Sequence, residues 1–170
     1  MTRRRYAVAA LGVAVVAFYG ALTRREAEHW QTSFSFWSYA VARNPDSYPP
    51  NINLGLHYET QKQWPEALRY YQRAYELRPM DTYAFTQYLR ALSLVHGPQA
   101  VIDAADTELR RSNVNAFAAY FYRAMGNEQL GRREAAVADY DRVMTLTRQG
   151  SGTWKAAQQG RERLAQSPAQ

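Results

Sequence analysis

A repeat with a period near 34 residues is the feature of this sequence that most restricts its fold. It is clearest when Tyr48 to Asp81 is aligned with the segments before and after it. The recurring positions are Ser33, Trp37, Ala40 and Pro45, then Ala67, Tyr71, Ala74 and Pro79, then Val101, Ala105, Glu108 and Asn113, and, after one inserted residue, Ala136, Tyr140, Val143 and Arg148. A fixed period of this length indicates supersecondary units stacked in a row, each burying its apolar face on its neighbour.

Two further sets of columns support helical units that pack closely. One set reads Leu54-Gly55, Tyr88-Leu89 and Arg123-Ala124, and another reads Asn51, Phe85, Tyr120 and Trp154. Small residues recur where two helices approach each other, and large aromatic residues recur where the adjoining space has to be filled.

The block from Asn53 to Pro79 (NLGLHYETQKQWPEALRYYQRAYELRP) resembles the tetratricopeptide repeat, a helix-turn-helix unit. The matching residues are Leu54, Gly55, Tyr58, Ala67, Tyr71, Ala74, Leu77 and Pro79. The segment from Tyr122 to Leu146 matches the same pattern through Ala124, Gly131, Ala136, Tyr140 and Leu146. The resemblance implies an all-α, right-handed solenoid of such repeats.

The unit between these two blocks departs from the family pattern. Ala105 replaces the large aromatic residue, and no proline ends the unit, although Gly97-Pro98 occupies its turn between helices. In the first unit, Pro65 fits the first turn of a helix and Pro79 stops the same helix.

The register of the repeats divides the chain into domains. A solenoid at 26–150 is predicted, made of a half-repeat at 26–45 and repeats at about 48–81, 82–115 and 117–150. The predicted helices are 26–42, 49–62, 65–78, 82–96, 98–111, 115–130 and 133–148. A polar helix at 151–166 caps the solenoid, with Ser151 or Thr153 as its N-cap and Trp154 on its inner face, and residues 167–170 form a tail.

An apolar segment from Tyr6 to Leu22 has 17 residues without a charge, and a membrane-spanning helix needs about 17 to 25. Arginines at 3–5 precede it, while arginines at 24–25 follow it beside two acidic residues, which favours a cytoplasmic N-terminus. No small-x-small site closes the run, so we expect an uncleaved signal anchor at 1–25 preceding the solenoid as one transmembrane helix. A cleaved signal peptide and an arginine-rich organelle presequence are the alternatives.

The expected localisation follows from this orientation. The chain is predicted to be a single-pass protein of a bacterial inner membrane, with its C-terminal domain in the periplasm. The same five arginines explain most of the net charge of +6. Removing them from the 21 basic residues leaves 16 against 15 acidic residues, so the body is nearly neutral and nucleic acid is not expected as a partner.

Motifs for catalysis are missing from the sequence. It has no cysteine and no GxxxxGK[ST], GxGxxG, HExxH or GxSxG pattern. No ligand lies at metal-binding spacing from His29, His57 or His96. Acidic pairs such as Asp103 and Asp106, or Asp139 and Asp141, are interpreted as solvated residues on polar helix faces. We therefore expect no enzyme, no cofactor, no metal and no small-molecule substrate.

A binding surface is implied by the family resemblance. In this family the first helix of each unit lines a groove, and the corresponding residues are Ile52, Asn53, Leu56, Glu59, Tyr83, Thr86, Gln87, Arg90, Phe121, Tyr122, Met125 and Gln129. The set is apolar and aromatic with few charges. Family members that clamp a chaperone's C-terminal carboxylate use several basic residues here, so that role is disfavoured. Gln87 and Tyr122 also interrupt the asparagine ladder that other members use.

The prediction for function is a non-catalytic, membrane-anchored adaptor that binds a protein partner, as subunit or assembly factor of an envelope membrane complex. The alternative is a regulatory module detached from, or docking on, a membrane enzyme. The stretch from His29 to Pro45 is similar to the C-terminal end of some multi-span glycosyltransferases with tetratricopeptide tails. Trp30, Phe34 and Trp37 share a helix face there, which fits either core packing or the membrane interface.

Overall fold

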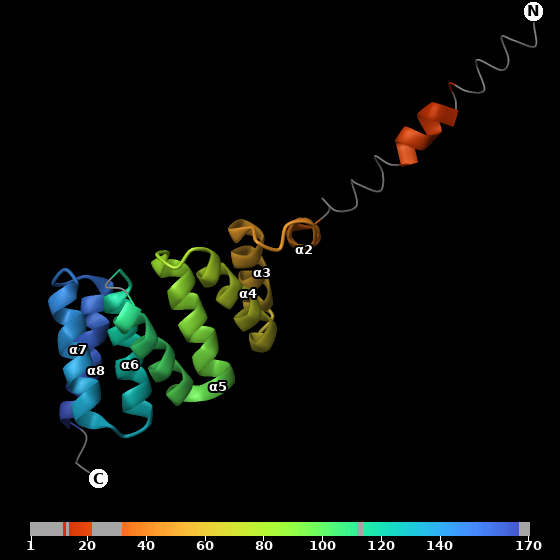
Figure 1. The fold of residues 1–170 in the computed structure, drawn as a ribbon. Helices are drawn as coiled ribbons and strands as arrows, with labels where there is room; N and C mark the ends of the chain where they lie inside the picture. Colours follow the sequence, from red (N-terminus) through yellow and green to blue (C-terminus); the bar gives the residue numbers. More distant parts are fainter. Residues whose placement is uncertain (1–11, 13, 22–31, 112–113, 167–170) are drawn as a thin grey trace, which may run out of the picture. The chain divides into compact units, whose positions relative to one another are not determined.

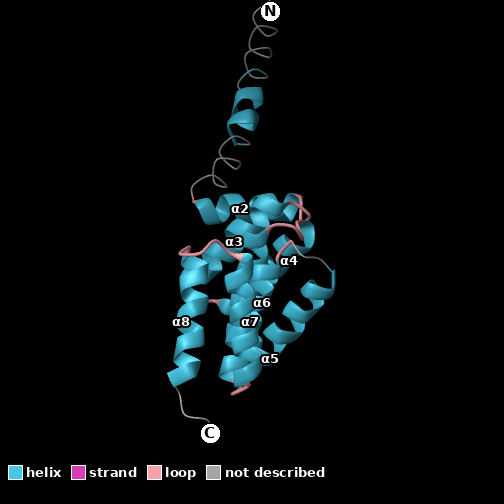
Figure 2. Cartoon of the chain, turned by 90° about the vertical axis from the view of Figure 1, so that its left-hand side faces the viewer, coloured by secondary structure: helices cyan, strands magenta, loops and turns pink. Residues whose placement is uncertain are grey.

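The structure is a computed structural model, drawn in Figure 1, that describes residues 12, 14–21, 32–111 and 114–166. The chain divides by its contacts into two compact units, residues 1–45 and residues 46–170. Every element in the described ranges is a helix, and Figure 2 shows only helices and loops there. The predicted all-α class is therefore confirmed for the described part of the chain.

In the first unit, α2 (Ser33–Arg43) begins with a capping box. Thr32 has an extended backbone, and its hydroxyl accepts a hydrogen bond from the Ser35 amide at 3.0 Å, while the Ser35 hydroxyl accepts one from the Thr32 amide at 3.2 Å. The prediction of one helix over 26–42 is therefore wrong at Thr32, because the capping residue starts a new helix there. Residues 26–31 lie outside the described residues.

The predicted membrane span from Tyr6 to Leu22 is described only in part, at residues 12 and 14–21. Residues 14–21 of the span are helical, and Val16, Phe18 and Tyr19 expose more than half of their surface, at 72%, 62% and 63%. Among the described residues, no helix combines the length and the apolar composition needed to cross a bilayer. The anchor at 1–25, Trp30 and the tail at 167–170 stay predictions, because they lie outside the described ranges wholly or in large part.

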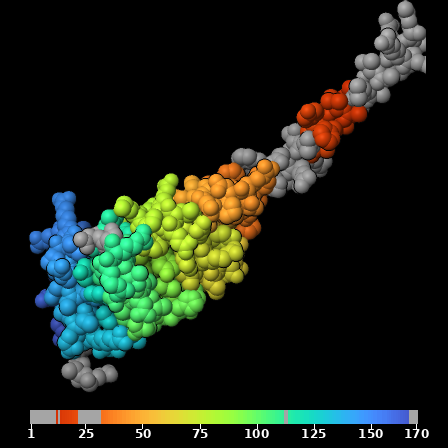
Figure 3. Space-filling view, in the orientation of Figure 1, coloured from red at the N-terminus to blue at the C-terminus, as the bar shows by residue number. Residues whose placement is uncertain are grey.

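The second unit is a stack of consecutive helices: α3 (Tyr48–Thr60), α4 (Trp64–Leu77), α5 (Thr82–Arg111), α6 (Ala116–Gln129), α7 (Arg133–Leu146) and α8 (Gly152–Gln166). Each helix packs mainly on the next one in sequence. The colour bands in Figure 3 accordingly follow one another in sequence order, from yellow to blue. The predicted helices of this unit end within two residues of the observed bounds.

α5 consists of two arms, residues 82–96 and 98–111, that meet at a kink. Gly97 has φ 79° and ψ −175°, a conformation that a residue with a Cβ rarely adopts, and Pro98 lacks the N–H that a continuous helix needs. The predicted turn at Gly97-Pro98 is confirmed. We call α3, the first arm of α5, α6 and α8 the first helices, and α4, the second arm of α5 and α7 the second helices.

The space inside each helix pair is filled by one large and one small side chain. The three pairs in the predicted register are Gly55 with Tyr71, Leu89 with Ala105, and Ala124 with Tyr140, and all six residues are buried. A Cβ added to Gly55 would lie 2.5 Å from the Tyr71 ring. The middle repeat lacks the aromatic residue but carries Leu89 in place of glycine or alanine. The sum of the two side-chain volumes in the helix pair is therefore conserved.

The predicted capping role of α8 depends on small residues rather than on its tryptophan. The Ser151 hydroxyl accepts a hydrogen bond from the Trp154 amide at 3.2 Å, which confirms Ser151 as the cap. Ala157 and Gly160 are buried, and a Cβ at Gly160 would overlap the Tyr140 ring. Trp154 is half-buried, whereas Ala157 and Gly160 are the buried residues of the helix.

A buried carboxylate links the second helices of the first two repeats of residues 46–170. Glu108 is 2% exposed, and it accepts hydrogen bonds from the Tyr75 hydroxyl at 2.5 Å and the Asn115 amide at 2.8 Å. Asn115 also donates to the Pro79 carbonyl at 2.8 Å. The sequence analysis listed Glu108 only as a member of a repeat column and did not predict its burial. Its partner Tyr75 lies 33 residues before it, and its partner Asn115 lies beyond the end of its own helix.

The interpretation of Asp139 as a solvated residue is wrong. Asp139 is 4% exposed, and it accepts two hydrogen bonds from the Arg123 guanidinium, at 2.8 and 2.6 Å. Arg123 also donates to Asp106 at 2.5 Å, so one arginine joins two acidic residues on the second helices of different units. The hydrogen bond with Asp139 is the largest cause that raises the pKa of Arg123.

Asp139→Asn is therefore expected to destabilise the second unit. The amide presents an N–H₂ group where the guanidinium needs an acceptor, and a broken buried pair leaves an uncompensated charge, so we expect a loss of about 2–3 kcal/mol. Denaturant unfolding of the variant measures this loss. Asp141→Asn is the matched control, because Asp141 is half exposed and pairs with Arg161 at the surface. Equal unfolding midpoints for both variants would contradict the buried role of Asp139.

Candidate partner-binding groove

The twelve residues predicted to line a groove all lie on first helices. Four are on α3, four on the first arm of α5 and four on α6. Leu56 is 42% exposed and Tyr83 is 52% exposed, and Gln129 is also exposed. The remaining residues of the set are half-buried. Leu56 and Tyr83 therefore offer the most apolar surface of the set to another molecule.

Four of the predicted groove residues also support the core. Ile52 and Tyr122 pack against the larger buried cluster, and Phe121 and Met125 pack against the cluster around Tyr140. The Phe121 ring lies edge-on to the Tyr140 ring, with 6.1 Å between centroids. Substitution of these four residues would change stability as well as any binding.

The two charges in the groove neutralise each other. Arg90 forms an ion pair with Glu59, and its Nε and Nη2 donate to the Gln87 side-chain oxygen at 3.1 and 2.8 Å. Burial lowers the pKa of Arg90, but the hydrogen bond and the charge of Glu59 outweigh it and raise the pKa. Glu59 also accepts a hydrogen bond from the Tyr71 hydroxyl. These groups are therefore committed to contacts within the chain.

The amide of Asn53 is also used inside its own helix. Its Nδ2 donates to the Pro49 carbonyl at 2.8 Å. In the same column, Gln87 accepts from Arg90 and Tyr122 has no amide at all. The structure thus supplies no row of amides pointing at a backbone, in agreement with the interrupted ladder that the sequence indicates.

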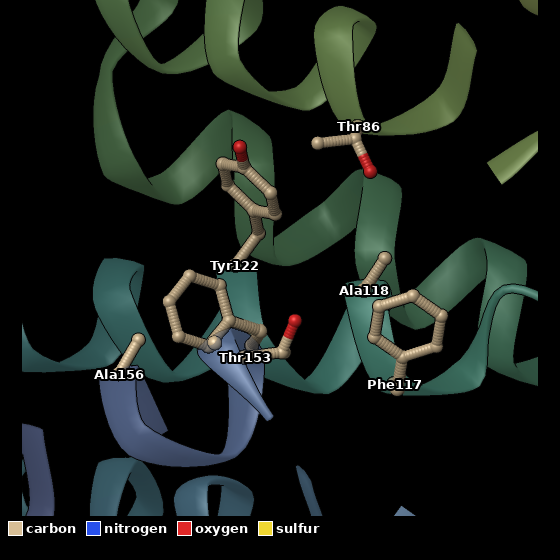
Figure 4. Close-up of a pocket in the computed structure, with 8 residues that line it drawn as sticks. Thr86, Phe117, Ala118, Tyr122, Thr153 and Ala156 are labelled. Atoms are coloured by element: carbon tan, nitrogen blue, oxygen red, sulfur yellow. The ribbon is translucent and has the colours of Figure 1, made fainter. Parts of the chain in front are cut away.

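A pocket of about 280 Å³ is lined by residues of three first helices, namely the first arm of α5, α6 and α8. Figure 4 shows the side chains around it. We call it the α8 pocket. Its lining residues are Thr86, Phe117, Ala118, Phe121, Tyr122, Gly152, Thr153 and Ala156. Three of the predicted groove residues, Thr86, Phe121 and Tyr122, are brought together here.

The sequence analysis did not predict that α8 forms part of this pocket. Gly152, Thr153 and Ala156 belong to the helix that we interpreted only as a cap. The signal was present, because Trp154 already stood in the repeat column of Asn51, Phe85 and Tyr120. Extending the groove positions by one more period would have placed Gly152 and Ala156 beside the groove.

The histidines and acidic pairs do not form a metal site in the described ranges, where no three such side chains lie together. The His57 ring contacts the Gln61 amide at 2.8 Å, and His96 is exposed, while His29 lies outside the described residues. Of the acidic residues, Asp103 accepts from Gln99 at 2.9 Å and Asp106 pairs with Arg123.

Comparison with known proteins supports the fold. The tetratricopeptide repeat family model matches residues 51–81. The structure is similar to the Arabidopsis OM64 TPR domain, with 21% identity, a TM-score of 0.56 and coverage of 71% of this chain and 96% of that one. It is also similar to the crystal structure of MamA protein, with 15% identity, a TM-score of 0.59 and coverage of 84% and 81%. No curated protein sequence matches the chain.

These findings define the fold. Residues 51–81 match the tetratricopeptide repeat model, and the all-α stack around them has a tetratricopeptide-like solenoid fold. Tetratricopeptide repeats generally mediate protein–protein interactions as scaffolds, and solenoids offer extended surfaces for this purpose.

The tyrosine–carboxylate bonds next to the groove predict a loss of stability at alkaline pH. Burial, with the hydrogen bond to Glu59, raises the pKa of Tyr71, and burial with the hydrogen bond to Glu128 raises that of Tyr140. Because the unfolded chain ionises its tyrosines near pH 10 and the folded chain does not, this contribution is complete below pH 10 and is lost above it. We expect each residue to account for a loss of up to about 1.4 kcal/mol at pH 11.

Denaturant titrations at pH 8 and pH 11 measure this loss. The double variant Tyr71→Phe and Tyr140→Phe should lose less stability between the two pH values than the natural chain. An equal loss in both proteins would mean that these two hydroxyls do not carry the effect.

Proposed function

We propose that this protein is a non-catalytic, membrane-anchored adaptor that holds a segment of a partner protein in the groove on its first helices. The partner is a subunit of an envelope membrane complex, which the adaptor joins as a subunit or assembly factor. The anchor is the segment from Tyr6 to Leu22, placed in a bacterial inner membrane with the N-terminus in the cytoplasm and residues 46–170 in the periplasm.

The observation that carries this proposal is apolar surface on the first helices. Leu56 and Tyr83 are half exposed, although neither stands at a chain end or in a loop. The charged groups beside them, Glu59 and Arg90, are paired with each other. A neutral surface of this kind favours an extended apolar peptide or an amphipathic helix over a charged ligand.

Two features of the N-terminal segment support the anchor. Three of the five flanking arginines precede the apolar run, and the two that follow it stand beside Glu26 and Glu28, so the positive-inside bias favours a cytoplasmic N-terminus. The helical residues 14–21 within the run carry no charge and expose Val16, Phe18 and Tyr19.

Photo-crosslinking tests the groove in cells. With p-benzoylphenylalanine in place of Tyr83 or Leu56, we expect a discrete protein adduct, because both side chains face the groove. Tyr83→Ala should reduce co-purification of that adduct partner at least tenfold, which corresponds to about 1.4 kcal/mol. The same crosslinker at Leu146 is the matched control, since Leu146 is 49% exposed but ends the second helix α7.

Two outcomes would contradict the groove. Adducts of equal yield at Leu146 and Tyr83 would indicate contact without a preferred face. A partner that survives Tyr83→Ala but crosslinks from Phe34 would place the contact on α2 or the membrane segment instead.

Protease accessibility tests the topology. In intact spheroplasts of a bacterial host, added protease should digest residues 46–170, because the proposed orientation puts them outside the cytoplasm. A cytoplasmic marker protein, which must stay intact, is the control. Protection of the C-terminus before lysis, followed by digestion after lysis, would reverse the orientation.

A further inference from the structure

The α8 pocket differs from the rest of the groove because a helix outside the three repeats forms one of its walls. Gly152, Thr153 and Ala156 of α8 line the pocket together with residues of α5 and α6, and Thr153 and Ala156 are labelled in Figure 4. α6 and α8 are also joined directly, since Arg163 donates to the Glu128 carboxylate at 3.2 Å. The wall is therefore held in place by the fold.

The chemistry of the pocket is apolar and uncharged. The lining residues include three aromatic rings, those of Phe117, Phe121 and Tyr122, and no Asp, Glu, His, Lys or Arg. The lining residues also include three with a hydroxyl group, Thr86, Thr153 and Tyr122, and a hydroxyl can donate to or accept from a peptide backbone. Burial is the main cause that raises the pKa of Tyr122, so its hydroxyl stays protonated at neutral pH.

The size of the pocket limits what can enter it. Its volume of about 280 Å³ equals that of about nine water molecules at roughly 30 Å³ each. Pockets for whole small-molecule ligands start at about 300 Å³. The α8 pocket therefore has room for one large side chain and lies at the lower limit of the sizes found for small-molecule ligands.

Charge decides which side chains fit. A buried charge needs a partner, and the nearest groove cation, Arg90, is already held by Glu59 and Gln87. Neither an acidic nor a basic side chain would find a counter-charge among the residues that line the pocket.

From these observations we infer that the α8 pocket binds one large, uncharged apolar side chain, aliphatic or aromatic, of the partner segment, and that α8 is a part of the binding site as well as a cap. This inference rests on the proposed function, because it names the residue class that the groove selects. It makes Gly152 and Ala156 specificity-determining positions, since their small size leaves the space open.

The probes for the test are N-acetyl-phenylalaninamide and N-acetyl-leucinamide, with N-acetyl-glutamine amide and N-acetyl-lysinamide for comparison. Each is titrated into the full-length chain in lipid nanodiscs, and the amide NMR signals of Thr153 and Ala156 are followed. We expect saturable shifts with the two apolar probes and at least tenfold weaker binding of the polar and charged probes. Equal affinity for the charged probe would overturn the inference.

Gly152→Leu is the blocking variant, because Gly152 lines the pocket and a Cβ there would meet no atom within 4 Å, so a large side chain can be added without a clash at its Cβ. We expect it to weaken the apolar probes at least tenfold, and Ala156→Leu should act in the same direction. Ala135→Leu is the matched control, since Ala135 is exposed on α7. Thermal melting verifies that each variant is folded, and unchanged probe binding in both folded blocking variants would refute the pocket.

The two proposals fail separately. If Tyr83→Ala releases the crosslinked partner but Gly152→Leu and Ala156→Leu do not, the groove binds its partner without the α8 pocket. If the apolar probes bind and are blocked as expected, but no groove position gives a protein adduct, the pocket exists and the adaptor function is wrong.

Discussion

The fold of residues 46–170 depends on one constraint. The volume packed between the two helices of each repeat is conserved. Tyr71 fills its pair because Gly55 leaves room for the ring, and a Cβ there would lie 2.5 Å from it. The middle unit reverses the sizes, with Leu89 opposite Ala105. The family pattern is broken at both positions, yet the fold continues, because a close-packed core requires the sum of the two volumes rather than either residue alone.

A second interaction fixes how neighbouring units stack and determines the chemistry of the groove. In two repeats, the hydroxyl of a tyrosine on the second helix donates a hydrogen bond to a glutamate on the first helix. An arginine on the first helix that follows in the stack forms an ion pair with that glutamate. The residues are Tyr71, Glu59 and Arg90, and then Tyr140, Glu128 and Arg163. These contacts join neighbouring first helices, and they leave the two charged groups of the groove, Glu59 and Arg90, paired within the chain. The surface left for a partner is therefore neutral and apolar.

The sequence by itself determined the fold, because the repeat is a local pattern copied several times. Each small residue, aromatic residue and turn proline was visible in more than one unit, so the helices of residues 46–170 and the turn at Gly97-Pro98 could be predicted closely. The groove positions followed from the same register. Their neutrality also follows in part, since only Glu59 and Arg90 carry charges there.

Only the tertiary structure decided which polar residues are buried and which helices share a site. Asp139 and Glu108 are buried because Arg123 and Tyr75, on other helices, satisfy their oxygens, and no local pattern encodes a partner one or two helices away. The α8 pocket is likewise formed by three helices that meet only in the folded stack. Periodicity specifies which face of a helix is apolar, whereas burial of a charge and the shape of a pocket depend on residues that folding brings together.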